Sequence, residues 1–256
     1  MTDLEKANRA FYEKAGKALR HLFESAKAKN ELHFALSLAP EFRGMQTAGW
    51  NTTEDTHVAF QEYLKFVKEC PDSSFRSRVA LAFYCHLAEA SGFYEIPKNM
   101  LRIIEGRRYS ICPFHDLVEK HKLTGNAIVP NANKVIRNLV GHSKELGFAD
   151  LAEVFRDAFD GDLRNGYAHA DYVIWSDGIR LPRRNGGIPE TIPWPKFSAL
   201  FEQAINFFQL LKEIVGENVS SYKSPKEIRG QLADEPAGVW KIHADAEKGT
   251  FSISSG

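Results

Sequence analysis

One short segment, Arg164-Asn165-Gly166-Tyr167-Ala168-His169, combines side chains that can carry out chemistry together. A guanidinium is always charged and forks onto phosphate oxygens, so Arg164 can stabilise a developing oxyanion. An imidazole titrates near neutrality, so His169 can accept or donate a proton. RNA supplies its own nucleophile, the 2′-hydroxyl, so such a site requires no metal ion and no cofactor. The residue types therefore predict phosphodiester cleavage.

The spacing of these two residues sets a geometric condition. Arg164 and His169 are five positions apart. On a regular helix, five steps of about 100° place two side chains roughly 140° apart, on different faces. They converge on one phosphate only if the helix bends or if two copies of the chain contribute. Gly166 permits a bend, and a twofold dimer would bring a second pair to the same cleft.

The elements that would position this segment are mainly helical, because apolar residues recur at helical spacing along most of the chain. Pro71 ends one predicted helix, and Asp72 or Ser73 can cap the next. Gly147 closes another. The apolar stripes of the six expected helices lie within residues 11–26, 60–67, 75–87, 135–140, 151–163 and 197–215.

The helix that leads into the motif has the clearest start signal. Asp150 is a natural N-cap, and Glu153 three residues later completes a variant of the capping box. We therefore expect one helix from Asp150 toward residue 163, with the motif at its C-terminal end. The last helix is expected to start at Pro195 and to end near residue 215, because Gly216 follows.

Two stretches break the helical rhythm. Residues 172–181 predict a short β-hairpin with its turn at 176–178, and a basic loop, residues 182–187, follows it. Past residue 220 the chain is polar, and residues 239–253 form a second candidate hairpin. We expect a mainly α protein: a helical bundle domain over residues 1–220 with a small β-hairpin insertion, then a polar tail over 221–256 with a C-terminal hairpin.

Composition narrows the choice of compartment and partner. The 33 basic and 33 acidic side chains cancel, so no global positive field draws the protein onto nucleic acid, and a polyanion site must be local. The sequence has three cysteines, Cys70, Cys85 and Cys112. An odd number of widely separated cysteines argues against a disulfide framework and is typical of a reducing compartment. The charged first twenty residues lack a signal sequence, and no membrane span is expected. Cytoplasmic localisation is the expectation.

The stretch from Leu163 to His169 resembles the signature of the HEPN superfamily: an arginine, a polar residue that is often asparagine, and a histidine a few residues later. The resemblance implies a helical bundle over about residues 75–215 and a metal-independent ribonuclease of toxin–antitoxin or other defence systems, with its site built across a homodimer. By position, Arg164 would bind phosphate, Asn165 would orient the site, and His169 would be catalytic. Tyr172 lies where a further contact with RNA is expected. RNA, a second copy and an antitoxin are the implied partners.

Structural explanations compete with this hypothesis. Cations near a helix C-terminus complement its dipole, and Asn165-Gly166 is also common at a helix end. The alternative function is therefore a non-catalytic helical module that binds RNA or a partner protein. Three basic groups could line an RNA channel if they flank the motif in space; their members are Arg102, Arg107 and Arg108, then Lys120 and Lys122, then Arg180, Arg183 and Arg184.

Two further clusters have ordinary explanations. Cys112, His115, Glu119 and His121 lack the tightly spaced ligand pairs of a structural zinc site, so we favour a surface histidine and a buried thiol. Cys85 lies on an apolar helical stripe beside His86. Adjacent helical residues point about 100° apart, so a buried thiol is favoured there over a nucleophile with its base.

Overall fold

The computed structural model describes residues 3–39, 52–71, 73–183, 187–245, 247 and 250–255. It is mainly helical with small antiparallel sheets, as the sequence predicted. The helices are α1 (Asp3–Lys29), α2 (Glu31–Leu38), α3 (Thr52–Glu69), α4 (Ser74–Ala88), α5 (Ser91–Ile104), α6 (Ala132–Glu145), α7 (Ala149–Ala158), α8 (Gly161–Ala168) and α9 (Trp194–Ser220).

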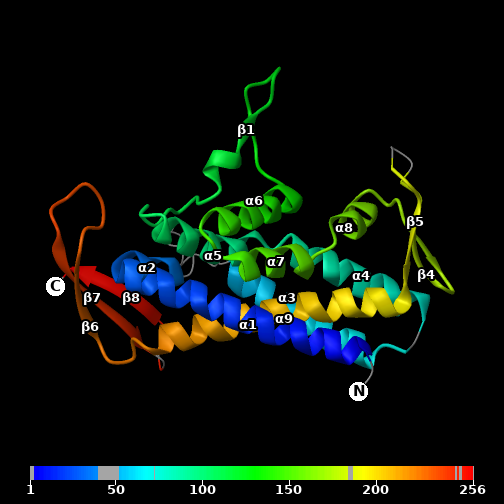
Figure 1. Ribbon diagram of the computed structural model, residues 1–256, viewed down its shortest axis with the longest axis horizontal. Coiled ribbons are helices and arrows are strands. Elements are labelled where there is room, and N and C mark those ends of the chain that lie inside the picture. The colour runs from blue at the N-terminus through cyan, green and yellow to red at the C-terminus, as the bar shows by residue number, and fades with distance from the viewer. Residues whose placement is uncertain are drawn as a thin grey trace.

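The two longest helices, α1 and α9, lie side by side and run in the same direction along the lower side of the view in Figure 1. Asn8 contacts Glu202 near one end, and Arg20 forms an ion pair with Glu217 near the other. The apolar stripe predicted for the first helix is buried in the core, including Leu19 and its neighbours. The amphipathic periodicity of the sequence therefore predicted the positions of both helices in the chain correctly.

Several predicted helix boundaries are confirmed. α3 ends just before Pro71, and the Ser73 hydroxyl caps α4 by accepting a hydrogen bond from the Arg76 amide at 3.2 Å. α6 closes at Gly147, whose φ of +82° favours glycine. Asp72, the other proposed cap, lies outside the described residues. α2 and α5 were not predicted: α2 is buried nearly all round, and α5 contains Pro97.

The helix expected to carry the motif is two helices. α7 ends at Ala158, Phe159 is extended, and α8 begins at Gly161. Phe159 is buried in the aromatic core, and the chain turns there. The side chain of Asp160 then caps α8 by accepting hydrogen bonds from the amides of residues 162 and 163 at 3.0 and 2.9 Å. The prediction for Asp150 was wrong, because this residue lies inside the first turn of α7.

The last helix begins where predicted but ends later. Pro195 is in its first turn, and the helix continues through Gly216 to Ser220. Val215 and Val219 pack against the core on both sides of this glycine. The apolar contacts of the final turns therefore outweigh the modest cost of an interior glycine.

Both predicted hairpins are present, and each gains a third strand. The first sheet contains β3 (Val173–Trp175), β4 (Gly178–Leu181) and β5 (Glu190–Pro193), and the second contains β6 (Lys226–Gly230), β7 (Gly238–Asp245) and β8 (Thr250–Ser255). All neighbouring strands are antiparallel. A further pair, β1 (Glu119–Lys120) and β2 (Ala127–Ile128), forms an arm that projects beyond α6 (Figure 1).

The C-terminal sheet is attached to the helices. Tyr222 and Ile242 are fully buried in the common core. The carboxylate of Glu31, at the start of α2, accepts hydrogen bonds from Lys226 at 2.7 Å and from the Tyr222 hydroxyl at 3.1 Å. In the described part of the chain, none of the helices combines the length and apolarity needed to cross a bilayer.

Candidate functional site

The motif occupies α8, a short helix that packs on α4 and β4. Gly166 is buried, and a Cβ added there would lie 2.6 Å from Leu181 Cδ2 and 3.3 Å from the Asp171 carbonyl oxygen. This glycine therefore allows close packing of the helix against β4. The expected bend at Gly166 is absent, because it lies within α8 and the chain turns later, at Ala170 (φ +51°).

Arg164 is held by its neighbours and partly open to solvent. Its guanidinium forms an ion pair with Glu89, the residue that caps the C-terminus of α4. The same guanidinium donates to Asn165 Oδ1 at 2.9 Å. The side chain is 14% exposed, and its buried Nε has no hydrogen-bond partner among the described residues. The cation is oriented, with one donor unused.

Asn165 joins this arrangement through its side-chain carbonyl. Asn165 Oδ1 accepts hydrogen bonds from Arg164 and from Asn133 Nδ2 of α6, the second at 3.1 Å. The two donors fix the orientation of the amide beside the guanidinium. Glu89 and Asn133 were not identified from the sequence. They come from α4 and α6, far along the chain, and no local motif marks either of them.

His169 has different surroundings. It is the C-cap residue of α8, its backbone N–H donates to the Asn165 carbonyl at 3.0 Å, and the residue is exposed. In the described structure, no hydrogen bond or ion pair connects its imidazole to Arg164. The fold therefore brings Arg164 and Asn165 together and leaves His169 accessible at the end of the same helix.

Tyr172 lies just beyond the motif, between aromatic and cationic side chains. Its ring stacks on Tyr167, with centroids 5.8 Å apart and planes 29° apart, and the Arg78 guanidinium lies over it at 5.9 Å. Burial raises the pKa of the Tyr167 hydroxyl above its ordinary value. The contacts with Tyr167 and Arg78 hold the half-buried ring of Tyr172 in place, and its exposed part could contact a ligand.

The structure also shows the environment of the two cysteine clusters considered from the sequence, around Cys85 and around Cys112. Cys85 is buried as predicted, and burial raises its pKa to about 12 against the opposing effect of the nearby Arg164. Its thiol is therefore protonated at neutral pH and is a poor nucleophile. Cys112 is exposed, so the prediction of a buried thiol was wrong there. Within the described residues, no group of three or more His, Cys, Asp or Glu side chains could hold a metal ion.

Of the three basic groups, the third reaches α8. Arg183 forms ion pairs with Asp162 at 2.8 Å and with Glu190 at 2.6 Å. Two carboxylates therefore balance this cation. Arg107 and Arg108 pair with acidic residues elsewhere, at the end of α5 and in the C-terminal region. Arg184 lies outside the described residues.

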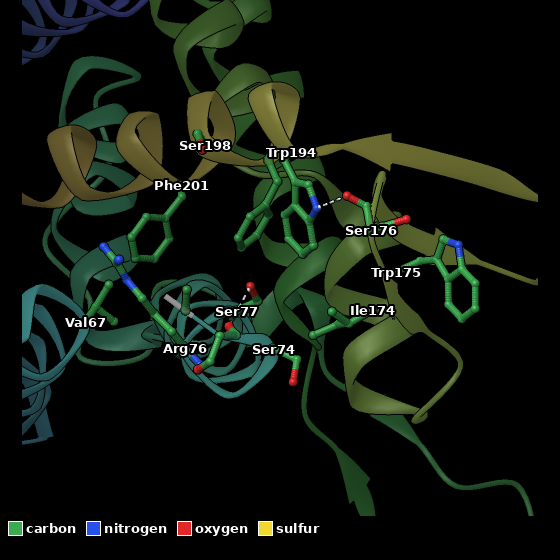
Figure 2. A pocket seen from close by; sticks show the side chains of 13 residues that line it. Val67, Ser74, Arg76, Ser77, Ile174, Trp175, Ser176, Trp194, Ser198 and Phe201 are labelled. Carbon is green, nitrogen blue, oxygen red and sulfur yellow. Dashed lines mark hydrogen bonds between the residues drawn. The ribbon is translucent and has the colours of Figure 1, made fainter. Parts of the chain in front are cut away.

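A large open pocket lies outside the motif (Figure 2). Its volume is about 910 Å³, and residues from the start of α4, from β3 and from the start of α9 line it. The motif residues are not part of its lining. Comparison of the chain with protein-family models, curated proteins and solved structures finds no match.

Proposed function

We propose that the chain is a HEPN-like, metal-independent endoribonuclease whose helices form a bundle of the kind typical of that superfamily. The observation that carries the proposal is the arrangement on α8: an oriented, partly open guanidinium at Arg164, an amide fixed beside it at Asn165, and an accessible imidazole at His169. These three side chains provide a phosphate ligand, an orienting group and a proton carrier.

In this reaction the RNA 2′-hydroxyl attacks the adjacent phosphorus. The O2′–P bond forms and the P–O5′ bond breaks, which leaves a 2′,3′-cyclic phosphate and a 5′-hydroxyl. His169 is the general acid/base that carries a proton between the two oxygens. Arg164 stabilises the charge on the pentacoordinate phosphate. Glu89 acts earlier, by holding the guanidinium until a phosphate oxygen competes for it.

The proposed site is dimeric. On one chain, the Arg164 guanidinium is bound by Glu89 and Asn165, whereas His169 caps the exposed end of the helix and, within the described part of the chain, forms neither a hydrogen bond nor an ion pair with that guanidinium. A twofold dimer would place the histidine of one copy near the arginine of the other. The toxin–antitoxin or defence setting, and with it an antitoxin partner, follows from the resemblance of the motif alone.

RNA cleavage in the presence of EDTA tests the proposal. Purified protein is incubated with a mixed-sequence RNA in excess EDTA, and products are separated by electrophoresis and checked for cyclic phosphate ends. We expect cleavage by the wild type and a loss of about 10²- to 10⁴-fold for His169→Ala. His115→Ala, which removes another exposed imidazole, should leave the rate unchanged. Equal cleavage by wild type and His169→Ala would reject the catalytic assignment.

A second candidate is a module that binds RNA or a protein without cutting it. The ion pair of Arg164 with Glu89 favours it, because a neutralised cation at a helix end can be purely structural. This candidate expects no cleavage by the wild type under any of these conditions.

A further inference from the structure

The pocket outside the motif has one aromatic wall and one polar wall. Trp194, Phe197 and Phe201 of α9 form the first, and the start of α4 contributes Arg76 and Ser77 to the second (Figure 2). The Trp194 Nε1–H donates to the Ser176 carbonyl oxygen at 3.0 Å. The indole is therefore fixed in place, and the surface that lines the pocket stays available for stacking.

The polar groups of the pocket favour an anionic ligand with hydrogen-bonding edges. Among its described lining residues, Arg76 carries the only formal charge. Serine hydroxyls, which can both donate and accept, are distributed around it; they belong to Ser73, Ser74, Ser77, Ser176 and Ser198. Flat aromatic surfaces beside a cation and hydroxyls suit a nucleotide, whose base stacks and whose phosphate is negative.

A short segment of chain connects the motif to the pocket lining. β3 follows α8 in the chain, and Ile174 of β3 lines the pocket. Five residue steps separate His169 from Ile174, a span of at most about 18 Å. Tyr172 lies between them with Arg78 over its ring, and Arg180 lies over Trp175 at 5.1 Å on the rim. Two cation–aromatic pairs therefore lie between the motif and the pocket, and Asp177 also pairs with Arg180 at 3.1 Å.

We propose that this pocket binds a base of single-stranded RNA a short distance from the scissile phosphate, with Trp194 and Phe201 as the stacking surface and Arg76 as a phosphate contact. The inference rests on the proposed function, because it takes the substrate of the motif to be RNA. It adds that the enzyme requires an unpaired strand, since a base inside a duplex cannot enter a pocket of this shape.

Binding of short oligonucleotides tests the pocket separately from cleavage. Fluorescein-labelled hexauridylate, hexaadenylate and a blunt-ended RNA duplex are titrated into protein that carries His169→Ala, so the RNA stays intact, and anisotropy gives Kd. Ser198→Trp places a large side chain in the lining of the pocket, and Ser220→Trp places the same side chain at the other end of α9. Arg76→Ala is compared with Arg229→Ala, which removes the same charge from β6 at the opposite end of the molecule (Figure 1).

We expect Ser198→Trp and Arg76→Ala each to raise the Kd for the hexanucleotides by about tenfold or more, with the two controls within about twofold of the parent. The duplex should bind more weakly than the single strands. Thermal unfolding of each variant shows that it is folded, and Arg76→Ala provides the result if Ser198→Trp is not.

The outcomes separate the two proposals. Equal Kd values for Ser198→Trp and Ser220→Trp, tight binding of the duplex alone, or no binding of either hexanucleotide would overturn the pocket assignment, whether or not the wild type cleaves RNA. Pocket-dependent binding by a protein that cannot cleave RNA would support the pocket and reject the proposed reaction.

Discussion

Two places in the molecule combine a basic side chain, a histidine and a glutamate, and they differ in how these groups are held. At α8, Arg164 pairs with Glu89, which is 44% exposed, and His169 stands in solvent. Between α5 and α6, Lys98 Nζ lies 3.0 Å from His142 Nδ1, and His142 Nε2 lies 3.3 Å from a carboxylate oxygen of residue 105. In this second cluster the lysine and the histidine are both buried.

Burial gives the two clusters different capacities. Desolvation and the neighbouring Lys98 lower the pKa of His142, and desolvation also lowers the pKa of Lys98. A neutral imidazole accepts a hydrogen bond from the ammonium and donates one to Glu105, so each of the three groups has a partner within the cluster. The buried lysine and histidine are therefore poorly placed to bind an external ligand. In the arginine cluster, Arg164 is 14% exposed and its partner Glu89 is 44% exposed, so an incoming anion can compete with Glu89 for Arg164 from the solvent side.

The largest expected effect comes from Arg164. Arg164→Ala should lower the rate of RNA cleavage by about 10²- to 10³-fold, because it removes the charge proposed to stabilise the transition state. The free energy of unfolding should fall by only about 1 kcal/mol, since Glu89 can be solvated. Single-turnover cleavage and urea denaturation measure the two quantities. A large loss of stability with normal cleavage would make Arg164 a structural residue.

His142→Ala should give the opposite pattern. Removal of the imidazole leaves the buried ammonium of Lys98 without this acceptor, so the free energy of unfolding should fall by about 1–3 kcal/mol. RNA cleavage at a temperature where the variant is folded should be unchanged. Urea denaturation followed by tryptophan fluorescence measures the loss, with the exposed His115→Ala as the matched control. Unchanged stability would mean that the buried cluster contributes nothing to folding.

Gly166→Ala tests how tightly the motif helix is seated. The added methyl group would meet Leu181 at 2.6 Å, so we expect a loss of about 1–3 kcal/mol in stability and a reduced cleavage rate as Arg164 moves. Gly216→Ala is the control, because nothing lies within 4 Å of its added Cβ in the interior of α9. It should instead raise stability by up to about 1 kcal/mol, as thermal unfolding would show.

The smallest expected effect is a pH dependence of stability. The pKa of His142 lies below its ordinary value of 6.5 in the folded protein, so the unfolded chain takes up a proton first as the pH falls. The stabilisation is therefore complete above about pH 6.5 and is lost progressively below it. Urea denaturation between pH 5 and pH 8, compared with His142→Ala, should show a shallower slope in the variant. Equal slopes would assign the effect to other groups, of which His33, also buried with a lowered pKa, is the first.

Local signals predicted the parts of the fold that depend on neighbouring residues. The apolar stripe of α1, the cap at Ser73, the start of α9 at Pro195 and the two hairpins all follow from short-range spacing and turn chemistry. The break between α7 and α8 was missed because it depends on Phe159, which is buried against aromatic residues far along the chain.

The sequence by itself determined which side chains could do chemistry, because Arg164, Asn165 and His169 lie within one short segment whose residue types have fixed chemical properties. Only the tertiary structure decided their surroundings. It placed Glu89 and Asn133 against the arginine and the amide, left the histidine in solvent, and formed a pocket from α4, β3 and α9 outside the motif. These contacts join residues tens of positions apart, and packing of the whole chain, rather than local spacing, fixes them.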